Sequence, residues 1–391
     1  MRRLIQIAAL QLYAFGLAAV QALGHVRTDE AKYLLDIPYP HPPLGRGLFH
    51  LLEGWIGQEL FWRMVIATLV VQGVWLVSDL CRGLPRSKRV AIAGAWILSA
   101  AVVLQAGTIM MAPLTALQGL LFVWMLLRPD LDQRKIAGWV ALLWFASLMT
   151  AYQGGLYLPI VVALLWRSRL PLWIQAFALG LPLAVLALYT ITNPLALASM
   201  VNAGTANEGM NLLEWGKGLT FTWAIGGSIV LGPLALIGMI LGRRWALLLS
   251  LFLVSAYIFV SFREYYAILL TPLFLAGAID AMRLLRIHPN LLLVAVALCT
   301  VGLVRHLPLA SPNPARAVLT GIAPQVGEGP ILIEGSFGHE WQYESPVPIR
   351  RYHLELLEEA QAVVCLQSCN DVPLGSWRSL PDLPVETWVR N

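Results

Sequence analysis

Long apolar runs recur from one end of this sequence to the other, and they constrain its fold more than any other feature. About eleven runs, most of roughly 15–24 residues, are separated by short loops rich in Arg, Pro and Gly, a length that suits helices crossing about 30 Å of hydrocarbon. The sequence therefore predicts an all-α polytopic membrane protein with about eleven transmembrane helices. The runs lie near residues 4–23, 61–80, 90–106, 114–127, 136–150, 156–166, 170–192, 221–241, 245–262, 267–285 and 291–304.

The composition agrees with a membrane location. Of the 391 residues, 58% are hydrophobic and only 13% are charged, which is too little polar surface to coat a water-soluble globule of this size. The formal net charge is +5, but no Lys/Arg-rich run carries the interleaved aromatic residues typical of nucleic-acid binding. We expect the lipid bilayer to be a partner of this chain and nucleic acid not to be one.

The basic residues favour one orientation. If Met1 is cytoplasmic, the cytoplasmic turns hold more than half of the 27 Lys and Arg residues, as the positive-inside rule requires. An odd number of spans then places the C-terminus outside the cytoplasm. The first 22 residues also fit a cleaved signal peptide, but their apolar run is longer than usual for one, so we interpret it as an uncleaved first helix.

The composition changes abruptly after the last apolar run. Residues 1–304 form the expected transmembrane body, and residues 305–391 form a polar tail. Within the tail, residues 330–337 and 362–366 predict short buried strands and residues 352–360 predict a helix, so we expect a small extracytoplasmic α/β domain. Cys365 and Cys369 lie in this tail and could pair in an oxidising compartment, although their spacing suits only some backbones.

The first extracytoplasmic loop, residues 24–60, carries adjacent carboxylates close to the bilayer. Asp29 and Glu30 must be solvated, paired or functional, since leaving them in hydrocarbon costs several kcal/mol. One interpretation is a solvated loop whose charges anchor two helix ends. The other is a site for an acidic lipid headgroup, where a carboxylate acts as general base and Arg or Lys stabilises phosphate charge on a leaving group.

Six short motifs follow one another along the chain. The first is DEAKY from Asp29, and the others begin at or include His41 (HPPL), Arg63 (GQELFWR), Ala112 (MAPL), Gln153 (QGGLYLP) and Arg263 (REYY). Their order resembles that of the C-type integral membrane glycosyltransferases (GT-C), especially the protein O-mannosyltransferase and aminoarabinose transferase group. Those enzymes use polyprenyl-phosphate-linked sugars, and the resemblance covers residues 1–285.

The resemblance implies roles for individual residues. Asp29 matches the catalytic carboxylate that deprotonates the acceptor for inverting transfer, and Glu30 matches the partner that positions the acceptor or a metal. Arg263 matches a position that holds the carrier phosphate. A divalent metal ion, if one takes part, would be held by Asp29, Glu30 and His41. The other candidate substrate-binding residues are Tyr33, His41, Lys32, Arg46, Tyr265, Tyr266 and Gln153.

The sequence also departs from the family pattern. Ala112 stands where the family usually has an acidic residue before Pro, and Gln153 stands where it usually has Lys. The sequence therefore leaves open whether a metal is required and which residues complete the binding site for the carrier phosphate. Arg263, Lys32 and Arg46 could equally be interface anchors beside lipid headgroups.

We therefore expect a glycosyltransferase of the inner or plasma membrane that moves a hexose or pentose from a polyprenyl phosphate to an extracytoplasmic lipid, glycan or protein. Two alternatives stay open. One is a transporter or flippase for lipid-linked saccharides, although no internal repeat with interrupted helices is visible. The other is a non-catalytic GT-C relative that serves as an assembly subunit.

Overall fold

The structure of the protein is a computed structural model, and it divides the chain into two compact units. The membrane unit comprises Met1–Ala19 and Pro38–Leu309, and the α/β unit comprises Val20–Ile37 and Ala310–Asn391. We describe each unit by itself. The residues that the structure describes are 2–24, 26–35, 37, 41–56, 59–128, 130–202, 212–260, 263–285, 287–307, 309–310, 314–367, 369 and 377–390.

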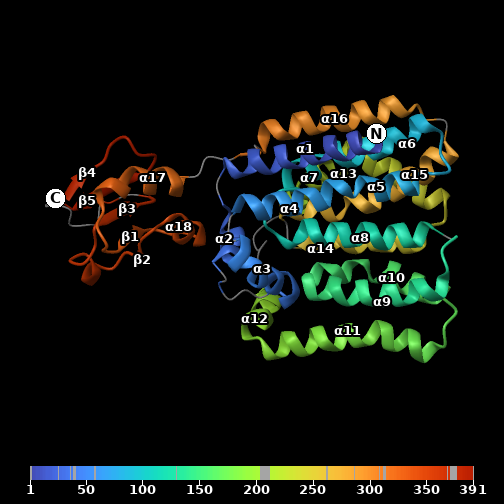
Figure 1. Cartoon of the computed structure of the whole chain (residues 1–391), viewed down its shortest axis with the longest axis horizontal. Coiled ribbons are helices and arrows are strands. Elements are labelled where there is room, and N and C mark those ends of the chain that lie inside the picture. The colour runs from blue at the N-terminus through green and yellow to red at the C-terminus, as the bar shows by residue number, and fades with distance from the viewer. Residues whose placement is uncertain are drawn as a thin grey trace. The chain divides into compact units, whose positions relative to one another are not determined.

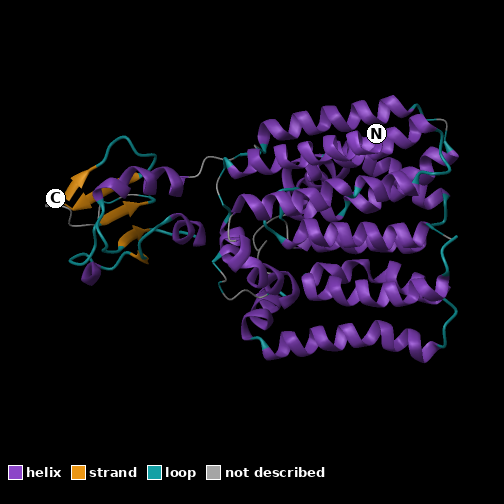
Figure 2. Ribbon diagram, viewed as in Figure 1, coloured by secondary structure: helices purple, strands orange, loops and turns teal. Residues whose placement is uncertain are grey.

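The described secondary structure of the membrane unit is entirely helical (Figure 2). Short 3-10 helices η1 (Tyr152–Tyr157) and η3 (Glu264–Leu269) precede α10 and α15. The α-helices, labelled in Figure 1, are α1 (Arg2–Ala22), α3 (Pro43–Ile56), α4 (Glu59–Gln72), α5 (Val74–Leu80), α6 (Arg86–Leu98), α7 (Ala100–Gln105), α8 (Met111–Leu127), α9 (Gln133–Thr150), α10 (Leu158–Arg167), α11 (Leu172–Thr192), α12 (Pro194–Asn202), α13 (Leu212–Leu241), α14 (Trp245–Val260), α15 (Thr271–Leu284) and α16 (Pro289–His306).

Each predicted apolar run coincides with one helix or with two consecutive helices. Among the described residues, seven helical segments are long and apolar enough to cross a membrane by length and composition, and α8 and α14 are shorter apolar helices. The count of about eleven spans therefore stays a prediction. The multi-pass helical architecture itself is confirmed, and its segments are Arg3–Ala22, Glu59–Leu80, Arg86–Gln105, Leu172–Thr192, Leu213–Leu241, Glu264–Leu284 and Pro289–His306.

Glycine allows the centre of the membrane unit to pack closely. A Cβ atom added to Gly277 of α15 would lie 2.2 Å from the carbonyl oxygen of Ala235, and one added to Gly238 of α13 would lie 2.0 Å from the carbonyl oxygen of Gly277. The two helices therefore meet backbone to backbone, as small residues allow in membranes. This contact holds α15, the most buried of the candidate spans.

The α/β unit is a five-stranded sheet with helices packed against it. Its strand order is β2-β1-β3-β5-β4; β2, β1 and β3 are parallel, whereas β5 is antiparallel to β3 and β4. The buried faces of α17 and α18 pack on Ile331 and Ile333 of β1. The elements are α2 (Thr28–Leu34), α17 (Pro314–Ile322), η4 (Ala323–Gln325), β1 (Ile331–Glu334), α18 (His339–Glu344), β2 (Ile349–Arg351), η5 (Leu354–Leu356), β3 (Ala362–Cys365), β4 (Trp377–Ser379) and β5 (Glu386–Arg390).

The first part of the outer loop packs with this sheet unit. The Thr28 hydroxyl donates a hydrogen bond to the Glu340 carboxylate of α18. Arg316 of α17 donates to the carbonyl oxygens of Ala22 at 3.2 Å and Gly24 at 3.3 Å. The sequence predicts that residues 24–60 belong to the membrane body, whereas the structure divides this loop and assigns Val20–Ile37 to the α/β unit.

The tail confirms the two predicted strands, corrects one predicted helix and shows the cysteine pairing that the sequence left open. The strands predicted at 330–337 and 362–366 are β1 and β3, and Cys365 forms a disulfide with Cys369. The helix predicted over 352–360 is wrong, because only Leu354–Leu356 makes a short 3-10 turn. Tyr352 instead continues the sheet ladder by donating its N–H to the carbonyl oxygen of Ile333, so the first residue of the expected helix belongs to the sheet.

Candidate functional site

Glu30 fixes the start of α2. Arg27 precedes the helix in an extended conformation, and its backbone N–H donates to Glu30 Oε2 at 2.8 Å. A carboxylate in the third helical position that reaches back to the residue before the helix satisfies a backbone donor and favours the positive helix end. Glu30 is only 1% exposed, so it is placed to orient α2.

Asp29 is the accessible member of the carboxylate pair. Its side chain is 27% exposed, and its Oδ1 lies 3.1 Å from Lys32 Nζ one turn later. This ion pair restrains the carboxylate without burying it. Tyr33, the fourth candidate on α2, is buried. The helix therefore combines one buried and one solvent-reachable carboxylate.

In the membrane unit, Arg263 occupies a turn whose backbone is held in place. Arg263 is extended and exposed, and it directly precedes η3. The side-chain amide of Gln105 donates to the carbonyl oxygen of Glu264 at 2.9 Å. Gln105 is only 3% exposed, so a buried group from α7 fixes the turn that presents the cation.

Gln153 also contacts this turn, through the side chain of Tyr266 in η3. Its Nε2 donates to the hydroxyl of Tyr257 at 2.8 Å and to the hydroxyl of Tyr266 at 3.0 Å. The Tyr266 ring makes edge contacts with Tyr257 and Tyr265, at centroid distances of 5.0 and 4.6 Å. Both amide hydrogens of Gln153 are thus engaged by tyrosines, so the geometry favours a positioning role toward the Arg263 turn.

His41 lies beside η1 and the end of α11. Its carbonyl oxygen accepts a hydrogen bond of 2.8 Å from the Tyr189 hydroxyl, and its ring centroid is 6.2 Å from that of Tyr152. Burial raises the pKa of the Tyr152 hydroxyl. Arg46 follows on α3 and is half-buried. The structure thus places His41 next to Tyr152 and Tyr189, which the sequence analysis did not single out.

A buried ion pair in α4 was not predicted. Arg63 is 1% exposed, its Nε lies 2.7 Å from Glu59 Oε1, and its Nη1 donates to the Gly107 carbonyl oxygen at 3.1 Å. The sequence signal was the four-residue spacing of Glu59 and Arg63, which puts both on one helix face. Arg63 ties α4 to the segment that follows Gln105, and so supports the Arg263 turn indirectly.

The described residues do not fit a metal centre. Among them, no group of three or more His, Cys, Asp or Glu side chains gathers as metal ligands. Glu30 accepts a backbone N–H, and Asp29 is paired with an ammonium group that would oppose a bound cation. Ala112, at the start of α8, supplies no ligand atom.

Comparison with solved structures identifies the architecture. The structure of ArnT from Cupriavidus metallidurans bound to undecaprenyl phosphate matches with a TM-score of 0.66 and 14% sequence identity, covering 98% of this chain and 97% of that chain. The apo form of the same protein matches with a TM-score of 0.62 and 15% identity over the same shares. This chain has the GT-C fold. It is a multi-pass membrane protein.

A second GT-C protein shares the fold over part of its length. The arabinofuranosyltransferase AftD from Mycobacteria matches with a TM-score of 0.52 and 14% identity, and the alignment covers 100% of this chain but 41% of that one. No protein-family model and no curated protein sequence matches this GT-C chain. The likeness is therefore one of fold, and the chemistry has to be argued from the residues.

Proposed function

We propose that this GT-C chain is a membrane glycosyltransferase that moves a sugar from a polyprenyl-phosphate donor to an acceptor outside the cytoplasm. The observation that carries the proposal is the fold shared over 98% of the chain with a structure that holds undecaprenyl phosphate. An accessible carboxylate at Asp29 and a supported cation at Arg263 add the residue types that the chemistry needs. The sugar is a hexose or pentose, and the acceptor is a lipid, glycan or protein.

The proposed reaction is a single displacement with inversion. Asp29 accepts the proton of the acceptor hydroxyl, whose oxygen attacks the anomeric carbon of the sugar. The bond from that carbon to the phosphate oxygen breaks, and the polyprenyl phosphate leaves with the electron pair. Arg263 stabilises the phosphate charge as it develops. Glu30 orients α2.

The residues around these two groups have supporting roles in the proposal. Lys32 restrains Asp29, and Tyr33 and His41 are further candidates for binding the substrate, each from its own unit. Arg46 assists with the phosphate, while Gln153 and Tyr266 position the Arg263 turn. The disulfide between Cys365 and Cys369 fits an oxidising compartment, and it supports a C-terminal unit outside the cytoplasm. The N-terminus is proposed to be cytoplasmic on the positive-inside rule alone.

Donor turnover tests the proposal. The purified chain in nanodiscs would be incubated with hexosyl and pentosyl phosphates of a polyprenol, together with a cell-envelope extract as acceptor source. We expect at least one lipid-linked donor to release polyprenyl phosphate, and nucleotide sugars to be left intact. Mass spectrometry of the lipid products reads this out. Folded protein that releases no phosphate from any lipid donor would contradict the proposal.

A further inference from the structure

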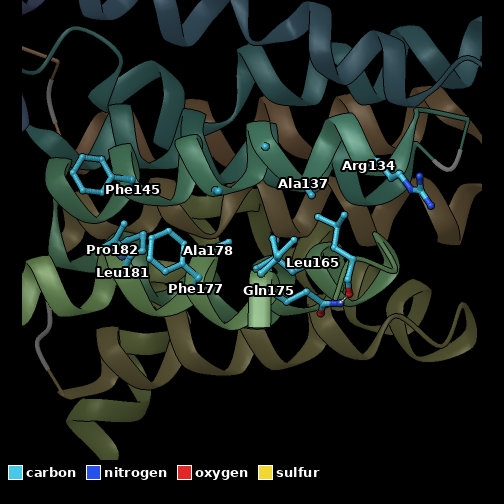
Figure 3. Close-up of a pocket in the computed structure, with 13 residues that line it drawn as sticks. Arg134, Ala137, Phe145, Leu165, Gln175, Phe177, Ala178, Leu181 and Pro182 are labelled. Carbon is cyan, nitrogen blue, oxygen red and sulfur yellow. Dashed lines mark hydrogen bonds between the residues drawn. The ribbon is translucent and has the colours of Figure 1, made fainter. Parts of the chain in front are cut away.

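An apolar cavity lies between α11 and the helices α9 and α10 of the membrane unit, and it is partly open to the surface beside the exposed Phe145, Phe177 and Leu181. Its volume is about 500 Å³, and Figure 3 shows its walls. Small residues of α9, namely Ala137, Gly138 and Ala141, line one side, and Ala178 of α11 lines the other. A Cβ added to Gly138 meets no atom within 4 Å, so the backbone of α9 borders open space.

A hydrogen bond links the two helices beside this cavity. The indole N–H of the fully buried Trp144 on α9 donates to the Leu179 carbonyl oxygen on α11 at 3.2 Å. This hydrogen bond joins α9 to α11 next to Ala178, which lines the cavity. An empty apolar space of this size would forfeit dispersion contacts along its lining, and water would find few polar partners there. In a bilayer, lipid acyl chains are available to occupy this space.

One end of the cavity is polar and cationic. Figure 3 shows Arg134 and Gln175 at one end, with Phe145, Phe177 and Pro182 toward the other. Arg134 is exposed at the start of α9, where the positive-inside rule predicts the cytoplasmic face. A cation above an apolar cleft between membrane helices matches the shape of an anionic phospholipid, whose headgroup lies at the surface and whose acyl chain lies in the core.

We propose that this cavity binds one acyl chain of an anionic phospholipid, with the lipid phosphate held by Arg134. The lipid would fill the space beneath α11 and fix the position of that helix. Near its other end, α11 carries Tyr189, which donates to the carbonyl oxygen of His41. The bound lipid therefore steadies a helix that contacts the candidate site, and the binding does not depend on glycosyl transfer.

Lipid retention tests this site with the full-length chain. Wild-type protein would be reconstituted in phosphatidylcholine nanodiscs containing phosphatidylglycerol, extracted, and examined by native mass spectrometry. We expect one phosphatidylglycerol to be retained per chain and to raise the thermal midpoint over that in pure phosphatidylcholine. Gly138→Leu should fill the cavity and abolish retention, whereas Gly180→Leu, at an α11 glycine that also has open space but does not line the cavity, should retain the lipid.

The charge is tested separately. Arg134→Gln should lower the preference for phosphatidylglycerol over phosphatidylcholine by about fivefold, and Arg86→Gln, the same change at the exposed start of α6, should leave it unchanged. Equal phosphatidylglycerol retention in the Gly138→Leu and Gly180→Leu proteins would overturn the proposal. So would retention of a polyprenyl phosphate instead of phosphatidylglycerol when both are supplied.

Discussion

Asp29→Asn should lower the rate of sugar transfer by about 10²–10⁴-fold, the range that a general base contributes. The amide has nearly the shape of the carboxylate but cannot accept the proton of the acceptor hydroxyl. The fold should persist, because the Asp29–Lys32 pair is partly exposed, at 27% and 23% of the two side chains, and such pairs contribute about 1 kcal/mol or less. The assay is the initial rate of polyprenyl phosphate release at a fixed donor concentration.

A matched variant separates the loss of a base from the loss of a charge. Asp382 is exposed in the α/β unit, and Asp382→Asn makes the same chemical change away from α2. We expect its transfer rate to stay within about twofold of the wild-type rate, since exposed positions of this kind have small effects. Similar rates for wild-type and Asp29→Asn proteins would remove Asp29 from the role of base.

Gly277→Ala should destabilise the membrane unit by about 1–3 kcal/mol, although alanine normally favours a helix over glycine. The added methyl group would lie 2.2 Å from the Ala235 carbonyl oxygen. Backbone atoms of α13 cannot rotate away as a flexible side chain could, so the two helices must separate. Thermal unfolding in detergent, followed by fluorescence-detected size exclusion, measures the loss as a lower midpoint or as aggregated protein.

Gly302→Ala provides the control for this change. Gly302 lies in α16, is exposed, and would place its Cβ with no atom within 4 Å. The same substitution there should leave the unfolding midpoint unchanged or raise it slightly. If Gly277→Ala and Gly302→Ala unfold at the same temperature, the close approach of α13 and α15 does not contribute to stability.

The sequence predicted the helices well because their apolar runs follow directly from the length needed to cross hydrocarbon. It also predicted β1 and β3, whose hydrophobic residues are bounded by turn residues. The helix expected over 352–360 does not form. The backbone N–H of Tyr352 donates instead to the carbonyl oxygen of Ile333 in the sheet. Local preference could not reveal that long-range bond.

The candidate site was only partly visible in the sequence. The adjacent carboxylates of α2 stood out because charge beside a bilayer is rare. Their different burial depends on the Arg27 bond to Glu30 and could be seen only in the fold. Gln153 was noticed as a replacement for lysine, but its two tyrosine partners lie 104 and 113 residues away. No local pattern links residues that far apart.

Cleavage of the donor is the most direct test of glycosyl transfer. Purified chain would be reconstituted in vesicles with a polyprenyl-phosphate sugar on one leaflet and an acceptor extract, and the bond between the anomeric carbon and the phosphate oxygen would be followed by mass spectrometry and NMR. We predict that this bond breaks, giving free polyprenyl phosphate and an acceptor glycosylated with inverted anomeric configuration. Donor that crosses the bilayer with this bond intact would contradict transfer and identify a flippase instead.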